Sequence, residues 1–207
     1  MIRPPGVEGV VFTEAGDGDQ RQDPDARAAV AAALGLPDDW ASVRQVHGSA
    51  VHRTKSPGVI GEGDAVWSTV SRLPLSIFTA DCFGVVLHAA AAVGVAHTGW
   101  RGASAGLLGE LRAEMTASGH PPVRAAVGPG IGPCCFEVGD EVTARFDGFT
   151  AATTWGTPSV DLPGFIISEL AGLDVWSADR CTRHQPGWFS HRRDQTTARL
   201  ATIGWLP

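Results

Sequence analysis

The sequence has few charged residues, and the positive ones are not clustered and are almost all arginines. Charged residues make up 18% of the 207 positions, the formal net charge is -6, and Lys55 is the only lysine. No basic run is longer than Arg192–Arg193. We therefore expect no nucleic-acid partner, because attraction to a polyanion needs positive charge concentrated on one face. Small pockets that bind single anions remain compatible with this composition.

The sequence also lacks a long apolar segment. No stretch approaches the roughly 18 consecutive apolar residues that a membrane-spanning helix needs. The first residues, MIRPPGVEGV, have no apolar centre of the kind found in signal peptides. We expect no membrane association and a cytoplasmic location. With 43% hydrophobic residues, residues 1–207 are expected to form one domain with a substantial core.

Cysteine is scarce as well, with only Cys82, Cys134, Cys135 and Cys181. Cys134 and Cys135 are neighbours in sequence and cannot easily bridge each other. In a reducing compartment, free thiols or metal ligands are the better interpretation of such a set. We expect Cys134 and Cys135 to pack inside a turn and Cys181 to lie in the core.

Helices and strands are both predicted, without strict alternation. The clearest helix covers residues 24–34, where Asp23 can cap the start, Pro24 suits the first turn and Gly35 can end it. Further helices are expected at about 103–118, 137–146 and 162–172, and a Gly-rich loop runs to residue 63. Strands are expected at 7–12, 40–46, 50–54, 77–79, 85–87, 93–96, 123–127, 175–178 and 198–206. This mixture predicts an α/β to α+β fold, a single domain with mixed β-sheets and flanking helices.

Three residues with metal-binding side chains lie at the ends of predicted strands. Cys82 and His97 belong to the central stretch from Ser76 to Gly102, and His47 lies upstream, where strand parity places it beside apolar neighbours. Two imidazoles and one thiolate suit Zn²⁺, and three protein ligands leave a fourth position for water or substrate. The spacing is not that of a zinc finger. The alternative is two hydrogen-bonded histidines and a buried cysteine that packs as a small apolar residue.

Five motifs occur in one order across most of the chain: QVHG at 45–48, TADC at 79–82, AHTGWRG at 96–102, GPGIGPCCFEVG at 128–139 and FSHRRD at 189–194. Together they resemble the YfiH-type laccase-domain family, long labelled multicopper polyphenol oxidases and described as purine nucleoside phosphorylases. The resemblance implies zinc bound by His47, Cys82 and His97, in a fold of the cytotoxic-necrotizing-factor-like cysteine hydrolase type. The chain departs from the family pattern in three ways. Residues 83–84 are Phe-Gly instead of the usual proline, the segment from Cys82 to His97 is short, and Phe136 replaces a frequent tyrosine.

The resemblance implies two reactions, and both need acid–base groups. The first is phosphorolysis of adenosine, inosine or guanosine, and the second is deamination of adenosine to inosine. Asp81 or Asp64 could carry protons in the second reaction. The alternatives are that Asp81 only orients His47 or His97, and that Asp64 caps a turn. His191 could act as an additional base or could be an exposed histidine.

Phosphorolysis also needs an anion site. Arg101, Arg192 and Arg193 are candidates to bind phosphate, because guanidinium groups can bind its oxygens in pairs. Arg44 is a further candidate for substrate binding. The alternatives are that Arg101 caps its turn and that one of the arginines at 192–193 pairs with Asp194.

Several rival functions follow from the same residues. A copper-dependent polyphenol oxidase is disfavoured, because the seven histidines include no His-x-His pair and Met115 is the only methionine besides Met1. A hydrolase could use Cys82 as a nucleophile with His97 or His47. A role in editing peptidoglycan precursors is known among bacterial relatives of this kind, but no residue here argues for it.

The last rival is a zinc-stabilised interaction module without catalysis. It predicts a closed site of four ligands, with Cys181 or His184 as the fourth. The preferred nucleoside, zinc or copper occupancy, and the choice between monomer and homodimer stay open at this stage.

Overall fold

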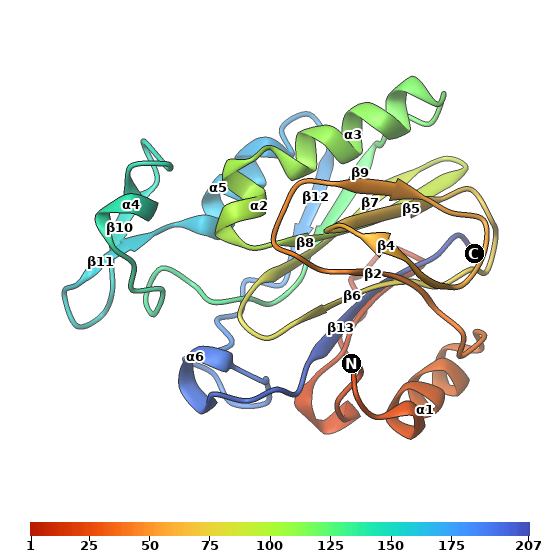
Figure 1. Cartoon of the computed structure of the whole chain (residues 1–207), viewed down its shortest axis with the longest axis horizontal. Helices are drawn as coiled ribbons and strands as arrows, with labels where there is room; N and C mark the ends of the chain where they lie inside the picture. Colours follow the sequence, from red (N-terminus) through yellow and green to blue (C-terminus); the bar gives the residue numbers. More distant parts are fainter.

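Two large β-sheets pack face to face, with helices on both outer surfaces (Figure 1). The computed structural model describes residues 1–207. The first sheet has the order β1-β13-β6-β2-β4, with β1 Val10–Phe12, β13 Leu200–Gly204, β6 Leu75–Thr79, β2 Ala41–Arg44 and β4 Gly58–Glu62. The second has the order β12-β9-β7-β8-β5-β3, with β12 Asp174–Ser177, β9 Arg124–Val127, β7 Phe83–Ala89, β8 Ala92–Thr98, β5 Ala65–Ser68 and β3 Val51–Arg53. A small third sheet pairs β10 (Thr150–Ala152) with β11 (Pro158–Val160).

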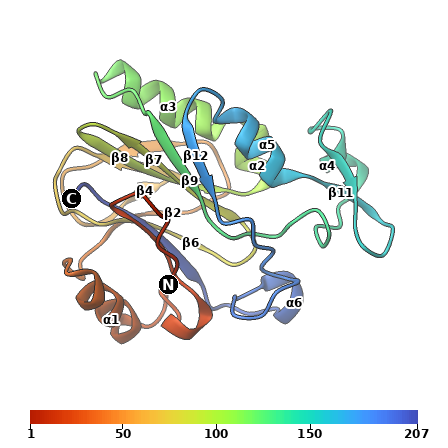
Figure 2. The same cartoon turned by 180° about the vertical axis from the view of Figure 1, so that it is seen from behind.

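Both large sheets combine parallel and antiparallel pairs, so the predicted fold with mixed sheets and flanking helices is confirmed. Helix α1 (Pro24–Leu34) lies on the outer side of the five-stranded sheet. Helices α2 (Trp100–Ser104), α3 (Leu107–Ala117) and α5 (Leu162–Glu169) lie on the outer side of the six-stranded sheet (Figure 2). The short helices are η1 (Ala15–Asp17), α4 (Asp140–Thr143) and α6 (His191–Asp194). No helix has both the length and the apolar character required to span a bilayer.

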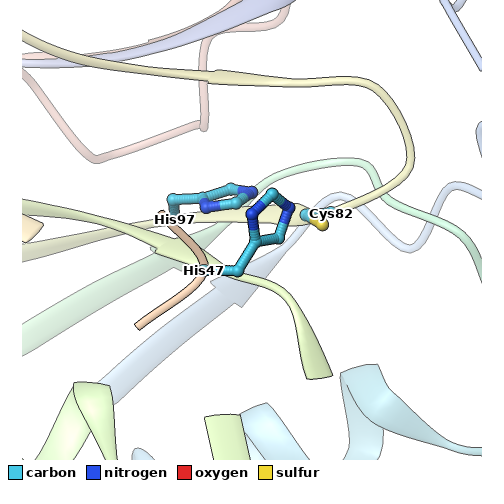
Figure 3. Close-up of side chains that lie close together, drawn as sticks. All are labelled: His47, Cys82 and His97. Carbon is cyan, nitrogen blue, oxygen red and sulfur yellow. The ribbon is translucent and has the colours of Figure 1, made fainter. Parts of the chain in front are cut away.

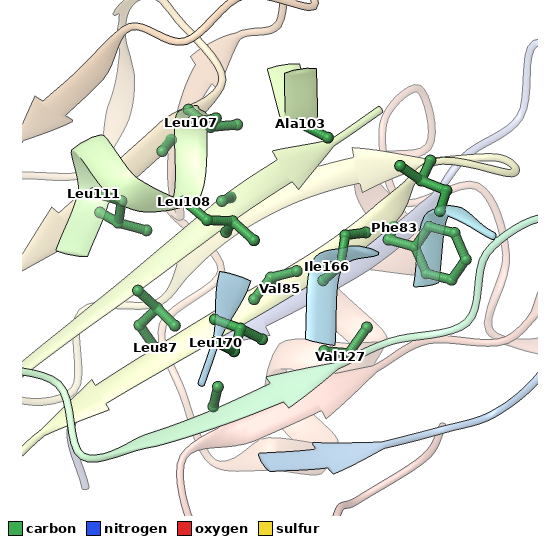
Figure 4. Packing of buried hydrophobic residues seen from close by; sticks show 14 of the residues in the cluster. Phe83, Val85, Leu87, Ala103, Leu107, Leu108, Leu111, Val127, Ile166 and Leu170 are labelled. Carbon is green, nitrogen blue, oxygen red and sulfur yellow. The ribbon is translucent and has the colours of Figure 1, made fainter. Parts of the chain in front are cut away.

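The central strands are buried on both faces, which explains their continuous apolar character. In β7, Val85 and Leu87 pack under the helices with residues such as Leu108 and Ile166 (Figure 4). Val86, between them, belongs to the cluster between the two sheets. Each such side chain contributes about 1.5–3 kcal/mol when fully buried. The molecule therefore has four layers, in the order helix, sheet, sheet and helix, and the ends of the central strands are held by packing on both faces.

Local signals predicted several elements well. Helix α1 has the predicted limits: the Asp23 side chain accepts hydrogen bonds from the amides of Asp25 and Ala26, and Gly35 ends the helix at φ 66°. Within the helix predicted at 103–118, the apolar side chains of α3 are buried, namely Leu107, Leu108, Leu111 and Met115. The predicted strands 50–54, 123–127, 175–178 and 198–206 all contain observed strands within one or two residues of their limits.

Other predictions of local structure were wrong. The helix predicted at 103–118 is two helices, because the chain turns at Gly106 with φ 80°. The helix predicted at 137–146 is reduced to α4, because Glu137 instead forms a β-bridge with Ser159. The predicted loop before Gly63 contains β4, since pairing with β2 overrides the low strand propensity of its glycines.

Candidate metal centre

The two histidines and the cysteine of the conspicuous motifs meet at one end of the sheets. His47 follows β2, Cys82 immediately precedes β7, and His97 lies near the end of β8. One ligand atom from each lies within 4.8 Å of the others. The two imidazole rings have centroids 4.8 Å apart at 79°, and all three side chains point toward one another (Figure 3). The structure therefore contains a possible metal site at the residues that the motifs predicted.

The backbone around His47 differs from the predicted strand. Strand β2 ends at Arg44, and His47 lies in a turn with φ 61°, a conformation that costs on the order of 1–3 kcal/mol for a residue other than glycine. The Asp64 carboxylate holds this turn. It accepts hydrogen bonds from the amides of Val46 at 3.2 Å, His47 at 3.0 Å and Gly48 at 2.6 Å. His47 is thus positioned by a buried acid rather than by strand parity.

The same carboxylate orients the second histidine. Nδ1 of His97 lies 2.8 Å from Oδ1 of Asp64, and both side chains are buried. Because Nδ1 is engaged, Nε2 is the nitrogen left for a metal. Burial raises the pKa of Asp64, but the hydrogen bonds from His97 and Gly48 outweigh it and lower the pKa below its usual value. Asp64 is therefore ionised and lies behind the ligands, outside the cavity described below.

The protonation states of Cys82 and His97 favour the binding of a cation. Burial raises the pKa of Cys82, but positive charge on His97 and hydrogen bonds from both histidines lower it to about 6. Burial lowers the pKa of His97, and the neighbouring Cys82 thiolate and Asp64 carboxylate raise it to about 9. Near neutral pH the metal-free site is thus a thiolate beside an imidazolium. A metal ion would take the place of that proton.

The donor set fits zinc. Zn–N bonds of about 2.0–2.1 Å and Zn–S bonds of about 2.3 Å require ligand atoms roughly 3.3–3.6 Å apart, a small adjustment from the observed cluster. Gly99 makes room for the sulfur, since a Cβ there would lie 2.9 Å from Cys82 Sγ. The three ligands also line a cavity, so one side of the site stays accessible.

The cavity has a volume of about 360 Å³, which is within the range of small-molecule sites. Its wall contains both polar and aromatic groups. Phe78, Trp100 and Phe136 contribute rings, and Gln45 and His191 contribute polar side chains. Sequence reasoning proposed a role only for His191 among these five. Gln45, Trp100 and Phe136 lie within the motifs quoted above but carry no titratable or metal-binding group.

Two of the predicted arginines lie in the cavity wall. Arg101 stacks its guanidinium 4.3 Å from the ring centroid of Trp100. Arg192 Nη1 donates to the Glu137 carbonyl at 2.8 Å, and its guanidinium lies 5.7 Å from the ring centroid of Phe136. Both guanidinium groups are therefore held against aromatic rings at the edge of the cavity.

The other two predicted arginines do not reach the cavity. Arg193 donates to the carbonyls of Thr182 at 3.0 Å and Trp188 at 2.7 Å and pairs with Asp194, so it fastens one loop. Arg44 is exposed and pairs with Glu62 at 2.9 Å. Neither residue belongs to the cavity wall, and the pairing of one of these arginines with Asp194 considered above is the one seen for Arg193.

Two further arginines, Arg21 and Arg199, line the cavity instead. Burial and the charge of Arg21 lower the pKa of Arg199. Sequence reasoning missed both, because Arg21 lies in a polar loop and Arg199 precedes the last strand without any motif. Together with Arg101 and Arg192 they give the cavity four guanidinium groups, which favours an anionic ligand.

Asp81 is the only acidic residue in the cavity wall. Its backbone has φ 88°, and its carboxylate accepts hydrogen bonds from Thr182 Oγ1 at 2.7 Å and the Arg192 amide at 2.6 Å. Neither hydrogen bond involves His47 or His97. The orienting role considered for Asp81 is therefore filled by Asp64.

Comparison with known proteins shows the family of this chain. The family model described as "Multi-copper polyphenol oxidoreductase laccase" matches residues 12–207. The chain belongs to this laccase-domain family. A purine nucleoside phosphorylase of Mycobacterium tuberculosis is 36% identical over 87% of this chain and 78% of its own length. The purine nucleoside phosphorylase YfiH of Escherichia coli is 35% identical over 84% of this chain and 77% of its own.

The laccase-domain fold is also seen in solved structures. YlmD from Geobacillus stearothermophilus superposes with a TM-score of 0.83 at 25% identity, covering 100% of this chain and 98% of that one. The family resemblance inferred from the five motifs is thereby confirmed. The family model's printed name refers to copper, so the name and the nitrogen–sulfur donor set point to different metals.

The closed site of four ligands, with Cys181 or His184 as the fourth, is not present in this laccase domain. Cys181 does not approach His47, Cys82 or His97; it lies in a separate cluster with Cys134 and Cys135. It is half-buried: it packs against the edge of the main core, as predicted in part, and also lines a second cavity. His184 lines that second cavity as well. Neither residue closes the candidate metal site.

Proposed function

We propose that this protein is a zinc-dependent purine nucleoside phosphorylase that also deaminates adenosine. Phosphorolysis would convert adenosine, inosine or guanosine and phosphate to the free base and ribose 1-phosphate. The observation that carries the proposal is one cavity whose wall combines a three-ligand cluster with four arginines. The names of the similar proteins from M. tuberculosis and E. coli support the same activity.

In this proposal His47, Cys82 and His97 hold the zinc, and Asp64 positions both histidines. Zinc with three protein ligands supplies Lewis-acid chemistry at an open coordination position. The donor atoms argue for zinc over copper, since no methionine and no His-x-His pair is available nearby. Copper remains an outcome that metal analysis would detect.

Phosphate binds to the arginines in this scheme. Arg101 and Arg192 are the first candidates, and Arg21 and Arg199 extend the positive wall. An oxygen of phosphate forms a bond to the anomeric carbon of ribose as the bond to the purine nitrogen breaks. The purine leaves with the bonding electrons and takes up a proton. The proton comes from dihydrogen phosphate, and Asp81, whose carboxylate lies in the wall, is the proposed carrier. The rings of Phe78 and Phe136 offer surfaces for the flat base.

One observation favours a second candidate. The Cys82 thiolate beside a protonated His97 is also the arrangement of a cysteine nucleophile and its base. A hydrolase of this kind would need no metal. Chelation therefore separates the two candidates, because it abolishes the zinc-dependent reactions and leaves a thiol enzyme active.

The decisive experiment measures bound metal and then follows adenosine with and without phosphate. The wild-type protein is compared with Cys82→Ala and with Asp174→Asn, an exposed change outside the cavity wall. We expect zinc in the wild type and the control, adenine only when phosphate is present, and inosine without it. Full activity after complete removal of metal would overturn the proposal, and copper with oxidation of phenols would favour the oxidase.

The proposal also includes location and assembly. Free thiols at all four cysteines suit a reducing compartment such as the cytoplasm. The partners are purine nucleosides and phosphate. A monomer and a homodimer both remain compatible with the site, since every proposed ligand comes from one chain.

A further inference from the structure

Three cysteines that the proposed function does not use meet at a second place in the fold. Cys134 and Cys135 lie in the Gly/Pro-rich segment after β9, and Cys181 follows β12. Their sulfur atoms all lie within 4.8 Å of one another, and those of Cys134 and Cys135 are 3.5 Å apart. None of the three forms a disulfide. We call these residues the three-thiol cluster.

The backbone fixes the two segments that carry the cluster. The amide of Gly130 donates to the Arg180 carbonyl at 3.2 Å, and the amide of Thr182 donates to the Gly130 carbonyl at 2.9 Å. The amide of Cys135 donates to the Gly132 carbonyl at 3.0 Å in a tight turn. The sulfur atoms are therefore brought together by folding, without a further ordering step.

The local electrostatics suit a cation between the sulfur atoms. The Gly132 amide donates to Cys181 Sγ at 3.3 Å. Burial raises the pKa of Cys181, but the backbone hydrogen bonds from Gly132 and His184 outweigh it, so the pKa is lowered. Burial and the two neighbouring thiols raise the pKa of Cys134 to about 12. A second thiolate is disfavoured here because it would lie beside the first, and a bound cation removes that repulsion.

The cluster is accessible from solvent. A cavity of about 550 Å³ has Cys134 and Cys181 in its wall. His184 lines the same cavity. An ion can therefore enter without unfolding of either segment.

We propose that Cys134, Cys135 and Cys181 form a second metal site, which binds a thiophilic ion, Zn²⁺ or Cu⁺, through three thiolates. Tetrahedral Zn–S bonds of about 2.3 Å place sulfur atoms about 3.8 Å apart, within the range that the cluster already spans. Thiolates select Zn²⁺ and Cu⁺ over harder ions. Binding forms three metal–sulfur bonds and releases the thiol protons to solvent, so no oxidant is needed. A disulfide would use only two of the three sulfur atoms.

The test uses the full-length Cys82→Ala protein, in which the first cluster has lost its thiolate. Reduced, chelator-treated protein is titrated with Zn²⁺, and separately with Cu⁺ kept reduced by ascorbate, each against a chromophoric chelator. We expect one ion per chain and protection of Cys134, Cys135 and Cys181 from alkylation. The arm with the tighter binding identifies the preferred ion. Adding Cys181→Ser or Cys135→Ser should weaken binding by more than about 100-fold, beyond the usual loss from an outer-shell partner.

A thermal shift keeps the proposal falsifiable if these double variants fail to fold. Zn²⁺ at about 100 times its Kd should raise the Tm of Cys82→Ala by about 5–10 °C. Three results would each overturn the proposal: no shift and no bound ion, binding that leaves the three thiols open to alkylation, or a disulfide between Cys134 and Cys181 in the isolated protein.

Discussion

The two clusters of metal-binding side chains differ in their donors and in what surrounds them. The first cluster, His47, Cys82 and His97, has two imidazoles oriented by one buried carboxylate and opens into a cavity with four arginines. The three-thiol cluster has only sulfur donors, and backbone amides take the place of the carboxylate. The difference indicates that the first cluster, whose ligands lie beside an anion site, suits catalysis. The three-thiol cluster, which joins two loops, suits a structural role.

The largest expected effect comes from removing the thiolate of the first cluster. Cys82→Ala should lose the first metal ion and reduce phosphorolysis by more than about 100-fold, because a direct ligand matters at least as much as an outer-shell partner. Cys181→Ser should lose much less activity, so that its turnover stays at least about ten times that of Cys82→Ala. Metal analysis and single-turnover assays on both variants would check this contrast. Equal losses in the two variants would mean that the clusters do not differ in function.

The buried carboxylate gives the second-largest effect. Asp64→Asn keeps the size of the side chain but removes the charge behind His97, so the first ion should bind about 10–100-fold more weakly. The three-thiol cluster should be unaffected. Competition with a chelator measures both affinities, and Asp174→Asn, an exposed carboxylate paired with Arg124, is the matched control. Unchanged affinity in Asp64→Asn would contradict the positioning role.

The arginines in the cavity wall should affect mainly the binding of phosphate. A hydrogen bond to a charged group is worth about 1.5–3 kcal/mol, so Arg192→Gln should raise the KM for phosphate roughly 10–100-fold. The backbone amide that holds Asp81 is retained in this variant. Arg44→Gln should leave this KM unchanged, since Arg44 pairs with Glu62 away from the cavity. Steady-state kinetics with phosphate as the varied substrate would reveal a wrong assignment of either arginine.

The smallest expected effect is a difference between Cys82 and Cys134 in how their alkylation rates depend on pH in metal-free protein. Thiolate is the reactive form, so alkylation rises as the pH rises through the pKa. Cys82, with a pKa of about 6, should react fully at pH 7, and Cys134, with a pKa of about 12, should not. Peptide mapping after alkylation between pH 5 and 8 gives each rate. Similar profiles for the two residues would show that His97 does not stabilise the Cys82 thiolate.

Short-range signals in the sequence determined several features of this protein. The cap at Asp23 and the stop at Gly35 set the limits of α1, because both act on the neighbouring backbone. The motifs around His47, Cys82 and His97 predicted that these three side chains lie together, as they do. These predictions succeeded because caps, stripes and motifs are contained within a few consecutive residues.

Only the tertiary structure decided which distant side chains meet. It placed Asp64 behind His97. Arg21 and Arg199 line the cavity, whereas Arg44 and Arg193 do not. It also brought Cys181 beside Cys134 and Cys135, although nothing in the spacing predicts this. The physical reason is that these contacts depend on how two sheets pack and where their connecting loops end. That packing is set by buried apolar surface spread over the whole chain, which no short segment of the sequence contains.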